Sequence, residues 1–362
     1  SYFSSFLKPK SPFQKKGTAI KVSLYEEGKA KDSTHIKDFS SNLTLNLDKN
    51  SNNTASFSWY FGPNDYEVLN GYDSEYDNIL NFGWGLFRWI NIYAVQPVFN
   101  FLLSLGLGLG LAIFLLTFLI KLALMPVQWK MFVSSVKMKI LKPKTEALNA
   151  KYPNKDDAMK KQMEMMNLYK QSGASPLSGC LPMLIQMPIL LAVFRFFPST
   201  FGLRQESFLW AEDLSAYDSV YKLPFTIPMY GDHISLFPIL ASIAIFFYMR
   251  MSQSQQMNMA PQQEGMPDMQ KMMKMMMYFS PIMMLVFFNM YASSLSLYYF
   301  VSNLLTIIIM LVIKHYIIDE EKIHAKIQVN KLKPKKEGKF RKRLNDEMKQ
   351  AQEKKEKKKK KK

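Results

Sequence analysis

Five stretches of the chain are apolar over a length close to that of a bilayer-crossing helix, and this feature restricts the fold more than any other. The apolar stretches cover residues 101–125, 180–203, 233–249, 276–292 and 295–317. A helix needs about 20 apolar residues to cross the roughly 30 Å hydrocarbon core of a membrane. The pattern therefore predicts an α-helical integral membrane protein with five spans.

The positive charge is concentrated in two segments, and their positions predict the orientation of the spans. The formal net charge is +18, of which residues 126–178 carry +6 and residues 314–362 carry +12. Short loops rich in Lys and Arg stay on the cytoplasmic side of a membrane. We therefore expect both segments inside together with 250–275, and we expect the loop 204–232 and the first hundred residues outside.

The region before the first span has two parts. Apolar and polar residues alternate at 19–24, 43–47 and 56–59, which predicts strands of a β domain over residues 1–80. Residues 83–100 are aromatic and amphipathic, which fits either a helix in the outer membrane interface or the first turns of the span that follows. Because the first residue is Ser1 rather than Met, we expect a processed or truncated start.

Two segments are predicted to lie on the cytoplasmic side. Residues 130–172 read as a helical hairpin, in which Asn154 would cap the second helix. Residues 319–362 form a basic tail that ends in six consecutive lysines. The tail fits anionic lipid and the phosphates of ribosomal RNA equally well, since both bind clustered lysines.

Lys121 is an ionisable residue inside the first apolar stretch, and such residues are costly at membrane depth. One interpretation is snorkelling, because Lys121 lies close enough to Pro126 for its side chain to reach the interface. The other is a functional role, because Thr117, Lys121 and Gln128 share one helical face. A one-sided polar stripe of this kind should face protein or water rather than lipid. On another part of the same stretch, Gly106 and Gly110 predict a small-xxx-small helix contact.

Two other apolar stretches also carry polar residues. Ser296, Tyr299, Asn303 and Thr306 recur at spacings of three and four in the last stretch, and Gln186 lies between two prolines in the second. Interhelical hydrogen bonds explain each residue singly. Taken together with Lys121 and Gln128, they predict a wet pocket inside the membrane.

The composition excludes several classes of function. The single cysteine and the four histidines have no metal-type spacing, and no catalytic or nucleotide-binding motif is present, so we expect no enzyme, no metal and no cofactor. Half of the 26 methionines lie between Met251 and Met290. Three interpretations remain for them: an adaptable binding surface, lipid-facing or core filler, and a copper site of thioethers.

Four motifs resemble those of the YidC membrane-protein insertases over about residues 83–318. They are PLSGCLPMLIQMPI at 176–189, LKPK at 141–144, LYK at 168–170 and LYYFVSN at 297–303. The resemblance implies a five-helix insertase core (101–318) with a cytoplasmic hairpin, preceded by the C-terminal part of a periplasmic β-sandwich domain (1–80). It also implies a hydrophilic groove that is open to the cytoplasm and to lipid, in the inner membrane of a bacterium.

The resemblance assigns roles to several residues. Lys121 occupies the groove position where the family usually has arginine, so its charge remains while the planar fork of donors is lost. Thr117 and Tyr299 match positions near the nascent chain, Gln186 matches a groove-lining glutamine, and Met187 and Leu190 match an apolar slide for the incoming segment. The predicted substrate-binding residues are Lys121, Thr117, Gln128, Gln186, Met187, Leu190, Tyr299, Asn303 and Thr306.

These observations lead to one main hypothesis about function and two alternatives. The main hypothesis is an energy-independent insertase and chaperone for nascent membrane proteins, acting with or without the Sec translocon. The resemblance implies that its hairpin and tail meet the ribosome and the signal-recognition receptor. The first alternative is a small-solute transporter or channel with Lys121 as its anion site. The second is a structural membrane anchor that acts through the basic tail.

Overall fold

The computed structural model describes residues 2–24, 37–45, 54–72, 75–152, 158–174, 181–256 and 269–317, together with the isolated positions 325 and 328. The chain divides into two compact units. The first comprises residues 1–82 with 198–204, and the second comprises 83–197 with 205–362. Except for positions 325 and 328, the basic tail after residue 317 lies outside the described residues. So do Asn154 in the hairpin and Met257, Met259 and Met266.

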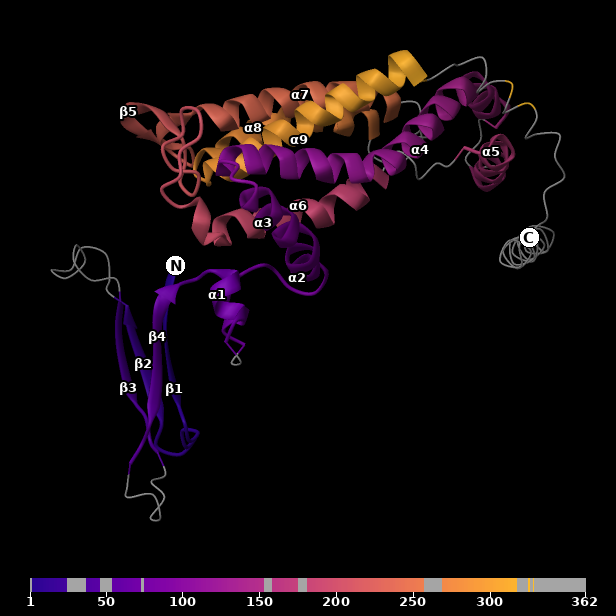
Figure 1. Ribbon diagram of the computed structural model, residues 1–362. Coiled ribbons are helices and arrows are strands. Elements are labelled where there is room, and N and C mark those ends of the chain that lie inside the picture. The colour runs from indigo at the N-terminus through magenta and orange to yellow at the C-terminus, as the bar shows by residue number, and fades with distance from the viewer. Residues whose placement is uncertain are drawn as a thin grey trace, which may run out of the picture. The chain divides into compact units, whose positions relative to one another are not determined.

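The first unit is built from two antiparallel strand pairs (Figure 1). Strand β1 (Phe3–Pro9) pairs with β4 (Phe57–Pro63), and β2 (Ala19–Leu24) pairs with β3 (Lys37–Asn42). Helix α1 (Tyr66–Asn70) and the 3-10 turn η1 (Tyr76–Ile79) follow β4. The stacked rings of Phe6 and Tyr76, 4.4 Å apart, join this turn to β1.

The strands differ in part from those expected. The segment 19–24 is strand β2, and most of the segment 56–59 lies within β4. β3 ends at Asn42, before the expected segment 43–47. β3 has the polar sequence KDFSSN and is exposed throughout, so its extended form comes from pairing with β2 and not from alternation. β1 lies within the predicted β domain but before the first of the three alternating segments.

The second unit begins with a helical segment that is amphipathic. It runs through α2 (Leu86–Ile90), a π-helical turn η2 (Asn91–Val95) and α3 (Gln96–Ser104). One side packs on α6 (Leu181–Ser199), where Asn91 Nδ2 donates to the carbonyl oxygen of Ala192 at 2.7 Å and the rings of Phe99 and Phe196 meet edge to face. The opposite side exposes Trp84, Trp89, Tyr93 and Phe101.

The stretch 101–125 is not one helix, which corrects the expected first span. α3 ends at Ser104, Gly106 adopts a left-handed φ of 76°, and α4 begins at Leu109. The predicted contact through Gly106 is wrong, because an added Cβ there would meet no atom within 4 Å. Gly110 instead lies against the ring of Phe208 in a loop.

Helix α4 (Leu109–Lys151) is continuous through 43 residues, with Pro126 and Pro143 inside it. At 1.5 Å per residue it is about 65 Å long. The apolar half of α4 and the lysine-rich half are therefore one helix. Helix α5 (Ala158–Ser172) packs on the second half around a buried apolar cluster. The cluster consists of Met138, Leu141, Met165, Tyr169 and Ala174.

Helices α6, α7 (Leu236–Gln256), α8 (Met269–Asn289) and α9 (Ser293–Val312) complete the second unit, and α9 contacts both α4 and α7 (Figure 1). Within the described residues, two helices are long and apolar enough to cross a membrane: 109–151 and 293–315. Only 33% and 39% of their apolar windows are buried. In a membrane, most of the apolar surface of these two helices would contact lipid. Helices α6, α7 and α8 carry shorter apolar stretches.

The loop from α6 to α7 contains a β-hairpin that is tied to the ends of three helices. Strands β5 (Ser219–Ile227) and β6 (Gly231–Ser235) lead directly into α7. Asn289 at the end of α8 accepts a hydrogen bond from the Ser235 amide and donates to the carbonyl oxygens of Tyr230 and His233. The Ser293 amide, at the start of α9, donates to Ala216 in the loop at 2.7 Å.

Candidate functional site

Helices α4, α6, α7 and α9 enclose a cavity of about 140 Å³. A buried water needs roughly 10 to 15 Å³ measured in this way, so the cavity has room for several waters. Its wall is mixed, with apolar residues such as Leu124 and Ile185 beside many polar groups. The polar lining residues are Lys121, Gln128, Ser135, Gln186, Tyr248, Ser252, Tyr298, Tyr299, Ser302, Asn303 and Thr306.

Lys121 is the one charged residue among the described residues that line this cavity. Its side chain is only 4% exposed, and its ammonium donates to Gln186 Oε1 at 3.3 Å. No carboxylate lies among the described lining residues, so the wall stabilises the ammonium charge through neutral polar groups alone. An anion that enters the cavity would neutralise this charge. A buried cation in this setting attracts anionic groups more strongly than an exposed one, because the surroundings screen it less.

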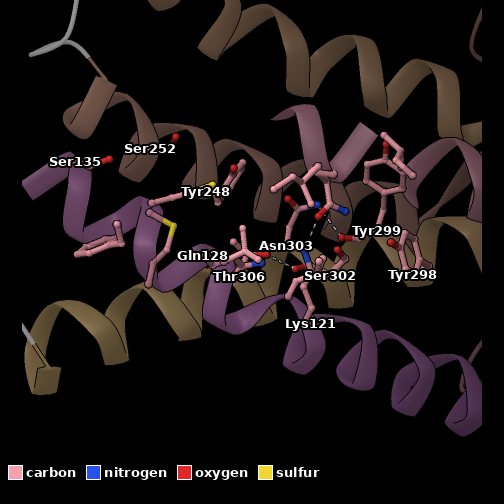
Figure 2. Close-up of a pocket in the computed structure, with 18 residues that line it drawn as sticks. Lys121, Gln128, Ser135, Tyr248, Ser252, Tyr298, Tyr299, Ser302, Asn303 and Thr306 are labelled. Carbon is pink, nitrogen blue, oxygen red and sulfur yellow. Dashed lines mark hydrogen bonds between the residues drawn. The ribbon is translucent and has the colours of Figure 1, made fainter. Parts of the chain in front are cut away.

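The polar residues of α9 are oriented by bonds to their own helix. Asn303 Nδ2 donates to the Tyr299 carbonyl at 2.8 Å, and Thr306 Oγ1 donates to the Ser302 carbonyl at 2.7 Å. Figure 2 shows Ser135 and Ser252 at one end of the cavity and Tyr298 and Tyr299 at the other, with Lys121 nearer the tyrosines. The polar groups thus extend along the cavity instead of gathering at one point.

The structure brings seven of the nine predicted substrate-binding residues into the wall of one cavity. These are Lys121, Gln128, Gln186, Leu190, Tyr299, Asn303 and Thr306. Thr117 and Met187 do not line it. Thr117 is buried one turn before Lys121 and donates to the Ile113 carbonyl at 2.7 Å, whereas Met187 is 39% exposed. Contact of any of the nine with a substrate stays a prediction.

Five polar lining residues were not predicted from the sequence, and one of them is Ser302, which directly precedes the predicted Asn303 on α9. Ser135 lies beyond the apolar part of α4, where the sequence suggested only a hairpin. Tyr248 and Ser252 lie four residues apart near the end of α7, a spacing that places them on one helical face. Tyr298 is adjacent to the expected Tyr299, and both line the cavity.

None of the described methionines between Met251 and Met290 lines the cavity wall. On α8, Met272, Met275 and Met276 are exposed, whereas Met277 is buried. Among the described residues, no group of three or more His, Cys, Asp or Glu side chains could hold a metal ion.

Outside the cavity, two carboxylates of the loop between α6 and α7 have pKa values shifted from the usual range of an aspartate. Asp218 Oδ2 accepts from Trp210 Nε1 and from the amides of Leu236 and Phe237 at the start of α7. Burial nevertheless raises the pKa of Asp218, since desolvation outweighs these bonds. The neighbouring His233 ring lowers the pKa of the exposed Asp232 carboxyl through a contact of 3.2 Å.

The long apolar helices and the buried polar cavity define a helical membrane protein with an internal cationic site. Comparison with known sequences narrows this class. The chain belongs to the family described as 60Kd inner membrane protein, whose model matches residues 101–322. The resemblance expected from the sequence motifs is thereby confirmed, as is a location in a membrane.

Several curated relatives carry the name membrane protein insertase YidC. The protein from Parabacteroides distasonis is 41% identical over 330 residues, which are 88% of this chain and 51% of that protein. The proteins from Bacteroides fragilis and Porphyromonas gingivalis are each 40% identical, over 92% and 97% of this chain. The chain spans about half the length of these curated relatives.

A solved structure of a YidC insertase with its first transmembrane domain resolved is also similar. It covers 73% of this chain and 56% of its own, at 23% identity and a TM-score of 0.40.

Proposed function

We propose that this protein is an insertase and chaperone for inner-membrane proteins, and that the described cavity is part of a hydrophilic groove for their translocating segments. The observation that carries the proposal is Lys121, a buried cation in the wall of a partly polar cavity that has no carboxylate among its described lining residues. Relatives that share about 40% of its residues bear the name membrane protein insertase.

The energetic reasoning for this function starts from the cost of moving polar groups through lipid. Each unsatisfied backbone group in the hydrocarbon core costs several kcal/mol, so a polar segment does not cross about 30 Å of lipid unaided. A water-containing cavity at the depth of Lys121 shortens that path. Transfer of the apolar part of the substrate into lipid then supplies the free energy, and neither a catalytic group nor a fuel is required.

The arrangement in the membrane is part of this proposal. Helices α6, α7 and α8 contain 19, 21 and 21 residues, so each is about 30 Å long and long enough to span the bilayer together with α4 and α9. The charge distribution supports a periplasmic position for the strand-containing first unit, where it would be part of a β-sandwich domain. It supports a cytoplasmic position for the hairpin of α4 and α5 and for the tail.

The proposed partners follow from the same orientation. Nascent membrane proteins are the substrates, and the Sec translocon is a second partner in the membrane. The hairpin and the basic tail would meet the ribosome and anionic lipids, because their lysines attract phosphate groups. The signal-recognition receptor is proposed on the family resemblance alone.

Reconstitution into lipid vesicles tests the function and the role of Lys121 together. Two substrates are compared, one with an acidic translocated segment and one in which the acids are replaced by amides. We expect Lys121→Glu to impair insertion of the acidic substrate more than that of the neutral one. Lys130→Glu is the matched control, because Lys130 is an exposed residue of α4 outside the cavity wall.

Three outcomes separate the alternatives. Equal loss with both substrates would rule out an electrostatic role for Lys121. Anion flux through the same vesicles without insertion would replace the proposal with a small-solute channel. Insertion that withstands Lys121→Ala and is lost on deletion of residues 331–362 would favour an anchor that acts through the tail.

A further inference from the structure

The β-hairpin between α6 and α7 has an apolar surface that is left uncovered by the described part of the chain. Eight of the nine residues of β5 are exposed, and the ninth, Leu223, is half-buried. Phe225 is 61% exposed, and Met229 in the turn is 79% exposed. Exposed apolar surface gathered in one element marks a site where a protein partner or a membrane is in contact.

The position of the hairpin is fixed by the ends of two helices. β6 leads directly into α7, and β5 lies at the end of the helical bundle where α7 begins (Figure 1). Asn289, the last residue of α8, donates to the carbonyl oxygens of Tyr230 and His233 at 2.9 Å. The turn of the hairpin is therefore held beside the end of α8.

The apolar surface of the hairpin continues that of α8. The exposed apolar residues near this end of α8 are Ile282, Met283 and Phe287. Met229 directly precedes Tyr230, and Met290, which is 60% exposed, directly follows Asn289. Because Asn289 donates to the Tyr230 carbonyl, the two exposed methionines flank one hydrogen bond. A surface that lipid covers on α8 thus extends onto the hairpin.

The charges of the hairpin are separated from its apolar turn. Residues 223–231 have the sequence LPFTIPMYG, which contains no charged residue. Lys222 and Asp232 directly flank this segment, and both are exposed. An apolar tip with tyrosine and lysine behind it matches the boundary of a membrane, where tyrosine rings lie at the headgroups and a lysine reaches toward water.

The backbone limits how deep the hairpin can lie in a membrane. Among the described residues β5 pairs only with β6, and the five residue steps from Lys222 to Ile227 face two steps on β6. Part of β5 therefore lacks ladder hydrogen bonds, and unpaired backbone groups are costly in hydrocarbon. Pro224 and Pro228 carry no N–H, which removes two donors from this stretch. The hairpin suits the headgroup region and not the membrane core.

We propose that the β5–β6 hairpin is a lipid-binding element, and that Phe225, Ile227 and Met229 insert into the headgroup and upper acyl region of the periplasmic leaflet. This inference rests on the membrane arrangement of α7 and α8 in the proposed function and adds a third contact with lipid. Because Asn289 joins the hairpin to α8, the inserted hairpin holds the ends of α7 and α8 at one depth.

Spin labelling of the full chain in phosphatidylcholine nanodiscs tests the insertion. The single cysteine is removed by Cys180→Ser, and a nitroxide is attached at Phe225→Cys or Met229→Cys, where the exposed side chain leaves no cavity. Collision rates of the label are compared for oxygen, which concentrates in lipid, and for a nickel chelate, which stays in water. Ile282→Cys on α8 is the standard for lipid, and Glu212→Cys, an exposed position of the same loop, is the standard for water.

We expect the oxygen-to-nickel ratio at positions 225 and 229 to exceed that at 212 about fivefold or more, as for groups roughly 5 to 10 Å inside the interface. Phe225→Asp should lower the ratio at Met229→Cys toward the value at 212, because a carboxylate is costly to remove from water. The matched control is Phe225→Leu, which keeps the apolar surface and should leave the ratio at 229 unchanged.

Ratios at both hairpin positions equal to that at 212 would overturn the proposal and leave the surface to a protein partner. A ratio at 229 that ignores Phe225→Asp would also overturn it. The remaining outcomes separate this inference from the proposed function. A water-exposed label at Ile282→Cys refutes the span α8 and the position of the hairpin with it. A hairpin that lies in lipid in a protein without insertion activity refutes the insertase function alone.

Discussion

Replacement of Gly110 by alanine would place a methyl group in the space occupied by Phe208. A Cβ at position 110 would lie 2.7 Å from the Phe208 Cβ and even closer to the ring carbons Cγ and Cδ2. Because Phe208 would clash near its own backbone and not at a flexible tip, its whole side chain must leave α4. The loop between α6 and α7 would lose one of its attachments to the start of that helix.

The expected cost follows from the burial of Phe208. Full burial of a phenylalanine is worth about 1.5 to 3 kcal/mol, and Phe208 is only partly buried. Overpacking typically costs about 1 to 3 kcal/mol, and the gain in helix propensity from Gly to Ala returns up to about 1 kcal/mol. We therefore expect Gly110→Ala to lower the free energy of unfolding by about 1 kcal/mol, or the melting temperature by roughly 2 to 4 °C.

Thermal unfolding of the purified protein measures this effect, with Gly202→Ala as the control. Gly202 has no atom within 4 Å of an added Cβ, so that change should be neutral or slightly stabilising. In the Phe208→Ala background the cost of Gly110→Ala should disappear, which leaves only the gain in helix propensity. The reasoning is refuted if Gly110→Ala matches Gly202→Ala, or if its cost persists in the Phe208→Ala background.

Three other changes test parts of the structure outside the cavity. Because burial raises the pKa of Asp218, its ionisation should lower the stability of the fold as the pH rises above 3.8. Asp218→Asn should remove this pH dependence of the melting temperature between acidic and neutral pH. The hydroxyl of Tyr152 donates to Glu164 at 2.6 Å and lowers the pKa of that carboxyl, so this hydrogen bond should stabilise the hairpin at neutral pH and weaken as the pH falls below 4.5. Tyr152→Phe should therefore make amide exchange in α5 less sensitive to acid. Asn289→Ala removes three hydrogen bonds between α8 and the loop and should cost about 3 kcal/mol in thermal unfolding, whereas a loss below about 1 kcal/mol would contradict their importance.

The cavity could be predicted in large part because charge and polarity are costly inside an apolar helix. Lys121 and Gln186 stood out for this reason, and the spacing of Asn303 and Thr306 placed them on the same face of α9. The resemblance contributed Leu190. Tyr298 was missed because its neighbour Tyr299 fits the polar stripe better, and only the packing of α9 against the other helices shows that both rings line the cavity.

Other features depend on properties that a residue pattern does not contain. The left-handed φ of Gly106 divides an apolar stretch that has no proline or charge at that point. The exposed strand β3 takes its form from its partner β2. The membership of Ser135 in the cavity wall requires α4 to continue past Pro126 without a break, and helix propensity alone disfavours this.

The uninterrupted length of α4 has a mechanical consequence. Lys121 and Lys151 lie on the same helix, about 45 Å apart along its axis. A tilt of only about 5° around Lys121 would therefore displace the far end by about 4 Å, which is about three-quarters of a helical turn. The second half of α4 is therefore a long lever for any force that acts on α5, and α4 can bend at Pro126 and Pro143.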